Sequence, residues 1–193
     1  MTHRLRIVLV DEKPDRSDDL ERALLDAGYE VVGRLSSRDD LRVRIPALAP
    51  EVIIVDMQSP DRDVFEDMQR IHAEQPRPIL MFVGESDSES IHAAVRAGVS
   101  AYVVDGVKSR SVGPIVEVAI ARFREFQALR SELEAARTSL AERKLVERAK
   151  GILMSRHRMS EDDAYHRLRR LAMDRNMKLA DVARQLVEMA ELL

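Results

Sequence analysis

Acidic residues close two short apolar runs in the N-terminal half of the chain. Residues 7–10 lead into Asp11 and Glu12, and residues 52–55 lead into Asp56. Because parallel strands of an α/β sheet deliver their carboxyl ends to one shared edge, we expect these three carboxylates to lie together. Oxygen ligands of this kind suit Mg²⁺, and one of the carboxylates could accept a phosphoryl group. The alternative is a set of strand-end acids that only accept hydrogen bonds.

The composition narrows the class of protein. A chain of 193 residues with 45% hydrophobic content can bury one good core and a smaller second unit. The absence of cysteine removes disulfides and thiolate metal sites, which fits a reducing cytoplasm. No apolar run approaches the length of a membrane span, and the first residues lack the apolar region of a signal peptide. We therefore expect a cytoplasmic protein without a membrane partner.

The net charge of −3 hides an asymmetry along the chain. Residues 137–193 carry 13 basic and 9 acidic side chains, a net charge of +4, whereas the other 136 residues carry 18 basic and 25 acidic ones, a net charge of −7. An acidic body with a basic tail suggests that the tail binds a polyanion. A solvated helical surface would show the same charges, so charge alone leaves both interpretations open.

The first 120 residues alternate between strand-like and helix-like segments. Apolar runs at 7–10, 29–33, 52–55, 79–83 and 101–104 are separated by amphipathic stretches such as 16–27, 64–75 and 88–97. Gly28 and Gly98 each follow a stretch of this kind, as glycine does where a helix ends. The pattern predicts an α/β fold, a flavodoxin-like doubly wound sheet of five parallel strands with right-handed crossovers.

One long helix is predicted after the sheet. Pro114 suits a helix start, and no further proline or glycine occurs before Gly151. Along this helix apolar residues recur at alternating spacings of three and four, which is the seam of a coiled-coil homodimer. A helix packed on its own chain is the alternative, although little apolar surface is left over to cover the seam. The seam residues are Phe126, Leu129, Leu133, Ala136 and Leu140.

The last 45 residues indicate a small helical unit. Ser160, with Asp163 three residues later, resembles a capping box that opens a helix, and one more amphipathic helix follows. We therefore divide the chain into a sheet domain at 1–123, a coiled-coil linker at 124–137 and a three-helix domain at 138–193.

Two family resemblances cover nearly the whole chain. Residues 5–123, with the strand-end acids and the Pro60-Asp61 step after Asp56, resemble the receiver domain of bacterial response regulators. The stretch E-R-A-K-G-I-L-M at 147–154 and the run L-R-R-L-A-M at 168–173 resemble the ANTAR domain, an RNA-binding antitermination module. The receiver resemblance implies that Asp11 and Glu12 are the metal pair and that Asp56 is the phosphoacceptor.

Two positions depart from the receiver pattern. The hydroxyl residue expected after the fourth strand falls on Val83, and the lysine expected after the fifth falls on Asp105. Phosphoryl transfer needs cations to stabilise the transferring oxygens. One unit-charge pair at ~4 Å is worth about 4 kcal/mol at an effective dielectric of ~20, and Asp105 has the wrong sign. We therefore expect a pseudo-receiver that requires no cofactor and binds Mg²⁺ weakly at most.

With these departures, the chain is most similar to NasT-type regulators of nitrate and nitrite assimilation. This resemblance implies a cytoplasmic, NasS-like sensor partner that binds nitrate or nitrite and sequesters the regulator until ligand arrives. The released protein would then bind stem-loops of leader RNA and prevent transcription termination. Nitrate rests on the resemblance alone.

Basic residues of the C-terminal domain are the candidate RNA contacts, since cations supply most of the affinity for phosphates. Ala149 and Gly151 flank Lys150 and would let an RNA backbone approach the helix, or would serve close packing between helices. Arg169 and Arg170 are adjacent and face different directions, so at most one of them is central. The candidate set is Lys144, Arg148, Ala149, Lys150, Gly151, Arg169, Arg170 and Lys178.

Three other functions compete with that of an RNA-binding antiterminator. No set of nucleophile, base and acid is present, which argues against an enzyme. A phosphorylation-dependent response regulator that uses Asp56 is the main alternative, and a DNA-binding factor that uses the last helices is a weaker one.

Overall fold

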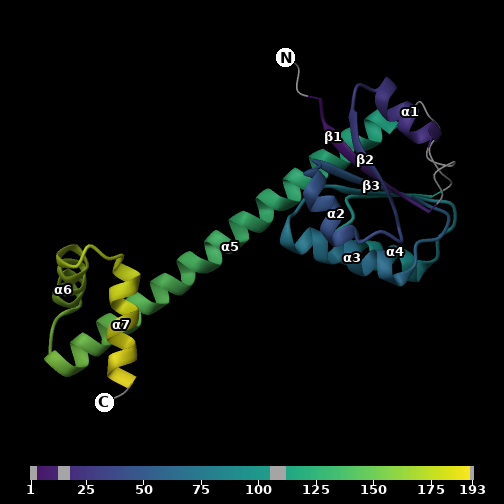
Figure 1. Ribbon diagram of the computed structural model, residues 1–193. Coiled ribbons are helices and arrows are strands. Elements are labelled where there is room, and N and C mark those ends of the chain that lie inside the picture. The colour runs from purple at the N-terminus through teal and green to yellow at the C-terminus, as the bar shows by residue number, and fades with distance from the viewer. Residues whose placement is uncertain (1–3, 13–17, 105–111, 192–193) are drawn as a thin grey trace. The chain divides into compact units, whose positions relative to one another are not determined.

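The computed structural model describes residues 4–12, 18–104 and 112–191, and the chain divides into two compact units, residues 1–127 and 128–193 (Figure 1). The finer division at residues 123 and 137 stays a prediction. Within the described residues, no helix is both long and apolar enough to cross a bilayer.

A five-stranded parallel sheet forms the centre of the first unit. The strands are β1 (Arg6–Asp11), β2 (Glu30–Ser36), β3 (Val52–Met57), β4 (Ile79–Val83) and β5 (Ala101–Val104). Their order across the sheet is β2-β1-β3-β4-β5, which is the flavodoxin-like order of a doubly wound fold. The predicted fold class is thereby confirmed.

Helices cover both faces of this sheet (Figure 1). On one face, α1 (Asp18–Asp26) and the first turns of α5 pack with Ile7 and Leu9 of β1. On the other face, α2 (Leu41–Leu48), α3 (Arg62–Glu74) and α4 (Ser88–Arg96) pack with Val8 and Val10. Side chains alternate between the faces of a strand, so apolar strands covered on both sides bury every residue.

Short polar side chains start the helices on the second face. Asp40, Asp61 and Asp87 each accept a hydrogen bond from the backbone N–H three residues later, which satisfies a donor that the helix cannot pair. Helix α2, which contains Pro46, was not among the predicted segments, because its apolar residues follow no clear helical period.

Helix α5 runs without a break from Val112 to His157, over 46 residues. This confirms the predicted long helix and reflects the lack of glycine and proline between Pro114 and Gly151. Val112, Val116 and Ala119 are buried in the first unit. The end of α5 belongs to the second unit.

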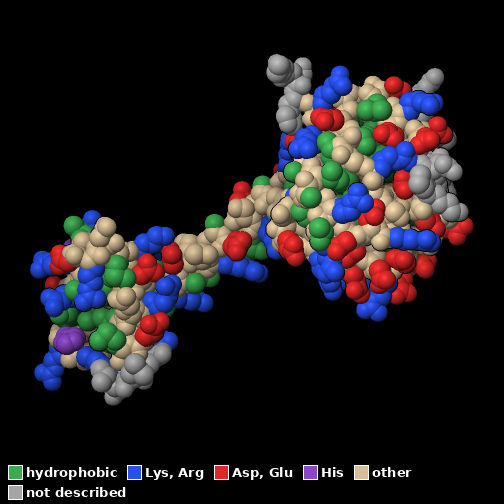
Figure 2. Space-filling model, viewed as in Figure 1, with side chains coloured by type: hydrophobic (Ala, Val, Ile, Leu, Met, Phe, Trp, Pro, Cys, Tyr) green, Lys and Arg blue, Asp and Glu red, His purple; other side chains and the backbone are tan. Residues whose placement is uncertain are grey.

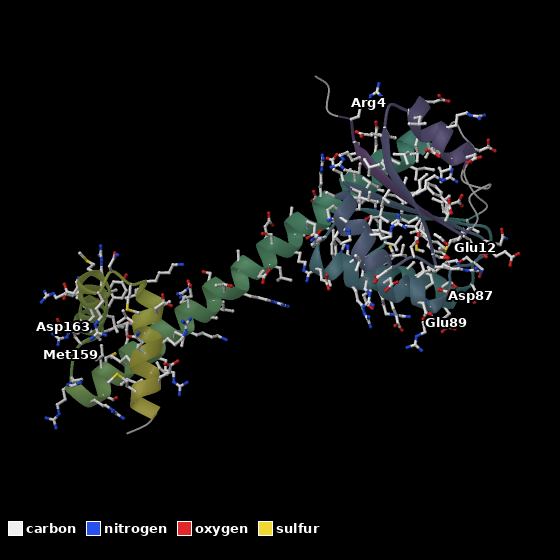
Figure 3. The ribbon with its side chains drawn as sticks, viewed as in Figure 1. Arg4, Glu12, Asp87, Glu89, Met159 and Asp163 are labelled. Atoms are coloured by element: carbon white, nitrogen blue, oxygen red, sulfur yellow. The ribbon has the colours of Figure 1, made fainter. Side chains whose placement is uncertain are left out.

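The second unit packs the end of α5 against α6 (Glu161–Asp174) and α7 (Leu179–Glu191). Ser160 Oγ accepts a hydrogen bond from the Asp163 backbone N–H and donates one to the Asp163 carboxylate, which confirms the predicted cap (Figure 3 labels Asp163). Small residues such as Ala164 and Ala183 let the three helices approach closely. The remaining buried core residues are Ala149, Leu153, Leu168, Ala172, Val182 and Val187.

Candidate functional site

Asp11 and Asp56 lie side by side at the carboxyl ends of two neighbouring strands, β1 and β3. The pairing of β1 with β3 sets Asp11 directly opposite Asp56, at the spacing of adjacent strands, about 4.8 Å. Both residues are buried, with relative exposures of 4% and 9%. Two carboxylates so close together in a poorly hydrated place require a compensating positive charge or shared hydrogen bonds.

Arg34 of β2 supplies a positive charge at this edge of the sheet. Its Nη2 lies 3.3 Å from Oδ2 of Asp11, and its Nη1 lies 2.7 Å from Oδ1 of Asp18 and 3.1 Å from Oε2 of Glu21. The hydrogen bond to Asp18 is the largest of the effects that raise the pKa of Arg34, with Asp11 next, so the guanidinium stays charged. Arg34 was not among the predicted site residues. The sequence feature that could have indicated it is an arginine inside an otherwise apolar strand segment.

Of the three predicted magnesium ligands, only Asp11 and Asp56 lie side by side in this structure. Glu12 is exposed and lies at the outer edge of the first unit (Figure 3). Among residues 4–12, 18–104 and 112–191, no three His, Cys, Asp or Glu side chains form a group that could hold a metal ion. In addition, the guanidinium of Arg34 donates a hydrogen bond to the carboxylate of Asp11. As placed here, Asp11, Glu12 and Asp56 therefore do not fit Mg²⁺.

Val83 occupies the position where the receiver pattern has a hydroxyl group. It ends β4 opposite Met57 and is fully buried in the core. Its isopropyl group has no donor for a phosphoryl oxygen, so this position could not sense a modified Asp56 through a hydrogen bond. Asp105, the other departure from the pattern, lies outside the described residues.

Ala149 faces inward in the second unit. It has no exposed surface and packs in the core with Leu153 and Leu168. The prediction that RNA approaches the helix at Ala149 is therefore wrong. The alternative, close packing between helices, is what the structure contains.

Lys150 joins α5 to the start of α6. Its Nζ donates to Oε1 of Glu161 at 2.7 Å and pairs with Oε2 of Glu147 at 2.9 Å, and the residue is only 7% exposed. The hydrogen bond that Lys150 donates to Glu161, followed by the one it donates to Glu147, raises the pKa of Lys150, and the bond to Glu161 lowers the pKa of Glu161. Neither glutamate was predicted from the sequence as a partner of Lys150. A role for Lys150 in RNA binding stays a prediction, although its charge is already paired within the protein.

Gly151 differs from its two neighbours because it lies on the exposed side of α5. Apart from its two chain neighbours and the nearby backbone of its own helix, no atom of the described residues comes within 4 Å of the position that a Cβ would occupy there. The other predicted RNA contacts are also on the surface, and Arg167 joins them. These exposed cationic residues are Lys144, Arg148, Arg167, Arg169, Arg170 and Lys178.

The predicted coiled-coil seam is exposed along the middle of α5. Phe126, Leu129, Leu133 and Leu140 expose between 52% and 60% of their surface, and Ala136 is exposed as well. A row of large apolar side chains at this exposure is costly in water, about 25 cal/mol per Å².

Comparison with known families divides the chain in the same way. Residues 7–112 match the response regulator receiver domain, and residues 134–187 match the ANTAR domain. The transcriptional regulatory protein PdtaR of Mycobacterium tuberculosis is 32% identical over 183 residues, which span 95% of this chain and 89% of that protein. The nitrate regulatory protein of Klebsiella oxytoca is 41% identical over 63 residues, which span 33% of this chain and 16% of that protein.

Solved structures similar to this chain include receiver domains. The signal receiver domain of a modulated diguanylate cyclase from Desulfovibrio desulfuricans G20 aligns with a TM-score of 0.56 at 22% identity, over 63% of this chain and 98% of that one. A CheY-like receiver protein from Methanospirillum hungatei JF-1 has the same score and identity, over 64% and 98%. At this identity the likeness shows the fold.

The ion pairs of Lys150 predict a pH window for the stability of the second unit. The pKa of Glu161 is lower in the folded chain than its ordinary 4.5, so its contribution is present above that value and is lost as pH falls through the folded pKa. The pKa of Lys150 is higher than its ordinary 10.5, so its contribution is present below that value and is lost as pH rises through the folded pKa. We expect Glu161→Gln to lower the melting temperature at neutral pH and to flatten its fall on acidification.

Scanning calorimetry of the full chain at a series of pH values measures this effect. Glu188→Gln on α7 is the matched control, because it removes a glutamate for which the structure records no ion pair. Equal acid sensitivity of the Glu161→Gln and Glu188→Gln proteins would contradict the role of the Lys150 pair.

Proposed function

Because the chain belongs to the response regulators that join a receiver domain to an ANTAR domain, a family of transcription regulators and not of enzymes, we propose that it binds leader RNA and prevents transcription termination. We propose further that a protein partner, and not phosphorylation of Asp56, controls this activity. The RNA would be a stem-loop bound by the second unit.

Gly151 is the observation that carries the RNA-binding proposal. Glycine inside a helix costs about 1 kcal/mol relative to alanine, and it is usually retained where a Cβ would collide with a neighbour. Beyond its own helix turn, no atom of the described residues lies within 4 Å of that position, so packing against another part of the described chain does not explain the glycine. A ligand backbone that approaches the exposed side of α5 closely would explain it.

The charges around Gly151 favour a nucleic acid as that ligand. Arg148 lies one turn before it on α5, and Arg169 and Arg170 are exposed on α6 of the same unit. In Figure 2 the lysine and arginine side chains are spread over the surface of this unit. Cations of this kind supply most of the affinity for phosphates, and arginine planes can stack on unpaired loop bases. Loop recognition fits better than a stacking platform, because Tyr165 is the only tyrosine, phenylalanine or tryptophan in residues 138–193.

Three features of the first unit support control without phosphorylation. Val83 offers no hydroxyl, the sequence has Asp105 where a lysine is expected, and Arg34 engages Asp11. Each of them removes or occupies a group that phosphoryl transfer to Asp56 would use. The opposing observation is that Asp11 and Asp56 still lie in register, so the phosphorylation-dependent regulator remains the alternative that the test below decides.

The first unit would then serve as a docking surface for the controlling partner. Acidic side chains gather on one side of it in Figure 2, and Figure 3 labels the exposed Asp87 and Glu89 on that side. We propose a NasS-like cytoplasmic sensor of nitrate or nitrite as the partner. The match of 63 residues to a nitrate regulatory protein supports this, whereas the name of the relative that matches nearly the whole chain does not mention nitrate.

The exposed seam on α5 supports a homodimer. Two parallel copies would bury Phe126, Leu129 and Leu133 against each other in knobs-into-holes packing. A dimer would also present two RNA-binding units, which would allow one leader with two stem-loops to be bound with high avidity.

Replacement of Gly151 by alanine is predicted to separate stability from RNA binding. Gly151→Ala should stabilise the second unit by about 0.5–1 kcal/mol, since alanine is the better helix residue and the space is open. The same methyl group should weaken binding to hairpin RNAs with randomised loops by about tenfold or more, about 1.4 kcal/mol. Thermal unfolding and filter binding measure the two effects.

Thr138→Ala is the matched control for this experiment, because it improves helix propensity at another exposed position of α5. Unchanged RNA affinity of Gly151→Ala, with the gain in stability present, would rule out close approach of RNA at this glycine. A changed oligomeric state of Gly151→Ala in light scattering would assign the glycine to a contact between copies.

Acetyl phosphate is predicted to leave the protein unmodified. After incubation with this donor and Mg²⁺, the intact mass should not increase by one phosphoryl group, because the hydroxyl and the lysine of the receiver pattern are absent. A Val83→Thr, Asp105→Lys double variant should gain some labelling. If the unaltered protein is labelled and Asp56→Asn abolishes the label, the phosphorylation-dependent alternative is correct.

A charge in the seam is predicted to break the dimer. Leu133→Glu places a carboxylate at the centre of the apolar stripe and should shift the protein to a monomer in light scattering. Ser131→Glu introduces the same charge two residues earlier, on the outer side of the same helix, and should remain dimeric. Equal masses for the two variants would mean that the seam does not form the dimer.

A further inference from the structure

The guanidinium of Arg34 is held by three carboxylates from two elements. Asp11 comes from β1, and Asp18 and Glu21 come from the first turns of α1, at distances between 2.7 and 3.3 Å. The side chain of Asp11 is 5% exposed and that of Arg34 is 29% exposed, so the contact lies where water screens charge only partly. Arg34 therefore neutralises part of the acidic edge from inside the protein.

The position of Arg34 in the sheet shows which charge it replaces. The strand order β2-β1-β3-β4-β5 places Arg34 next to β1, on the side away from β4 and β5. The lysine of the receiver pattern would follow β5, with β1, β3 and β4 lying between that strand and β2. Arg34 is thus too far across the sheet to stand in for that lysine. It lies beside Asp11, where a divalent cation would have to bind.

A divalent cation and Arg34 would compete for the same oxygen atoms. Mg²⁺ requires near-octahedral oxygen ligands at 2.0–2.1 Å, so a carboxylate shared with a guanidinium is a poor ligand for it. Two positive centres within a few ångströms of each other would also repel strongly in a partly buried place. With Arg34 in position, Asp11 cannot supply its full charge to a metal.

We propose that Arg34 is a tethered cation that keeps the strand-end acids closed to Mg²⁺. The proposal goes beyond the function above and does not depend on it, since it concerns metal affinity and not phosphorylation, RNA or a partner. Removal of the charge at residue 34 would leave Asp11, Asp18 and Glu21 without their common cation, next to Asp56. As placed, these acids do not form a group of three metal ligands. With the guanidinium gone, Asp18 and Glu21 would be free to turn toward Asp11, and hard oxygen ligands that converge in this way attract divalent ions.

The competing interpretation is that Arg34 only anchors α1 to the sheet. Both interpretations predict that loss of Arg34 destabilises the first unit, so stability alone does not separate them. They differ in metal affinity: an anchor that is lost leaves divalent-ion binding unchanged, whereas a displaced cation leaves a vacancy that Mg²⁺ or Mn²⁺ fills.

Divalent-ion binding by the full chain tests the proposal. Bound Mn²⁺ is measured by electron paramagnetic resonance, and Mg²⁺ by its displacement of Mn²⁺ and by its effect on the melting temperature. We expect Arg34→Gln, which removes the charge and keeps a hydrogen-bond donor for Asp18, to bind Mn²⁺ about tenfold tighter or more than the unaltered protein. Asp11→Asn added to Arg34→Gln should abolish this gain.

Two control variants distinguish the effect of the positive charge at residue 34 from the effect of losing any arginine. Arg34→Lys keeps a cation and should bind Mn²⁺ as weakly as the unaltered protein. Arg44→Gln on α2 removes an exposed arginine that pairs with Asp39 and should also have no effect. Equal affinity of the Arg34→Gln and unaltered proteins, or an equal gain in Arg44→Gln, overturns the proposal. Tight Mn²⁺ binding by the unaltered protein, abolished by Asp11→Asn, overturns it even if Arg34→Gln does not fold.

Discussion

Two buried carboxylates at neighbouring strand ends impose the main electrostatic constraint on the first unit. The parallel register that makes the sheet also forces Asp11 and Asp56 together, so the fold cannot separate them without loss of strand pairing. Charge must therefore be balanced from outside β1 and β3. Arg34 contributes to this balance at Asp11, and because the same guanidinium binds Asp18 and Glu21, it also ties β2 and α1 to β1.

The second unit applies the same principle with a lysine. Lys150 lies on the buried side of α5, where its aliphatic stem packs and its ammonium reaches Glu161 at the first turn of α6. An acid at that turn is favoured by the helix dipole as well as by the lysine. In both units a cation between acids of two elements fixes a helix start, and residues that look available for ligands in the sequence are already occupied.

Patterns among neighbouring residues explain which parts of the fold could be predicted from the sequence. The strands follow from short β-branched runs, the length of α5 from the absence of helix breakers, and the Ser160 cap from a spacing of three residues, all of which are properties of neighbouring residues. The pairs of Arg34 with Asp11 and of Lys150 with Glu161 span 23 and 11 residues. They depend on side-chain direction and on how elements pack, which one sequence does not contain. Ala149 and Gly151 show the limit clearly, since two small residues flank one lysine and only the helix rotation distinguishes a core position from an open one.

A structural role for Asp11 accounts for a buried carboxylate at this edge of the sheet without any phosphoryl chemistry. A role in metal binding alone would leave its contact with the guanidinium of Arg34 unexplained. In this structure Asp11 is a buried partner of Arg34, and its removal would leave a guanidinium facing an apolar strand end with one acceptor fewer. Loss of Asp11 would therefore remove one of the acceptors that hold the partly exposed guanidinium, beside those of Asp18 and Glu21. Under the proposed function, such a receiver fold would keep the register of a phosphorylation site while its surface served for docking, and its output would reside in the exposed helix around Gly151.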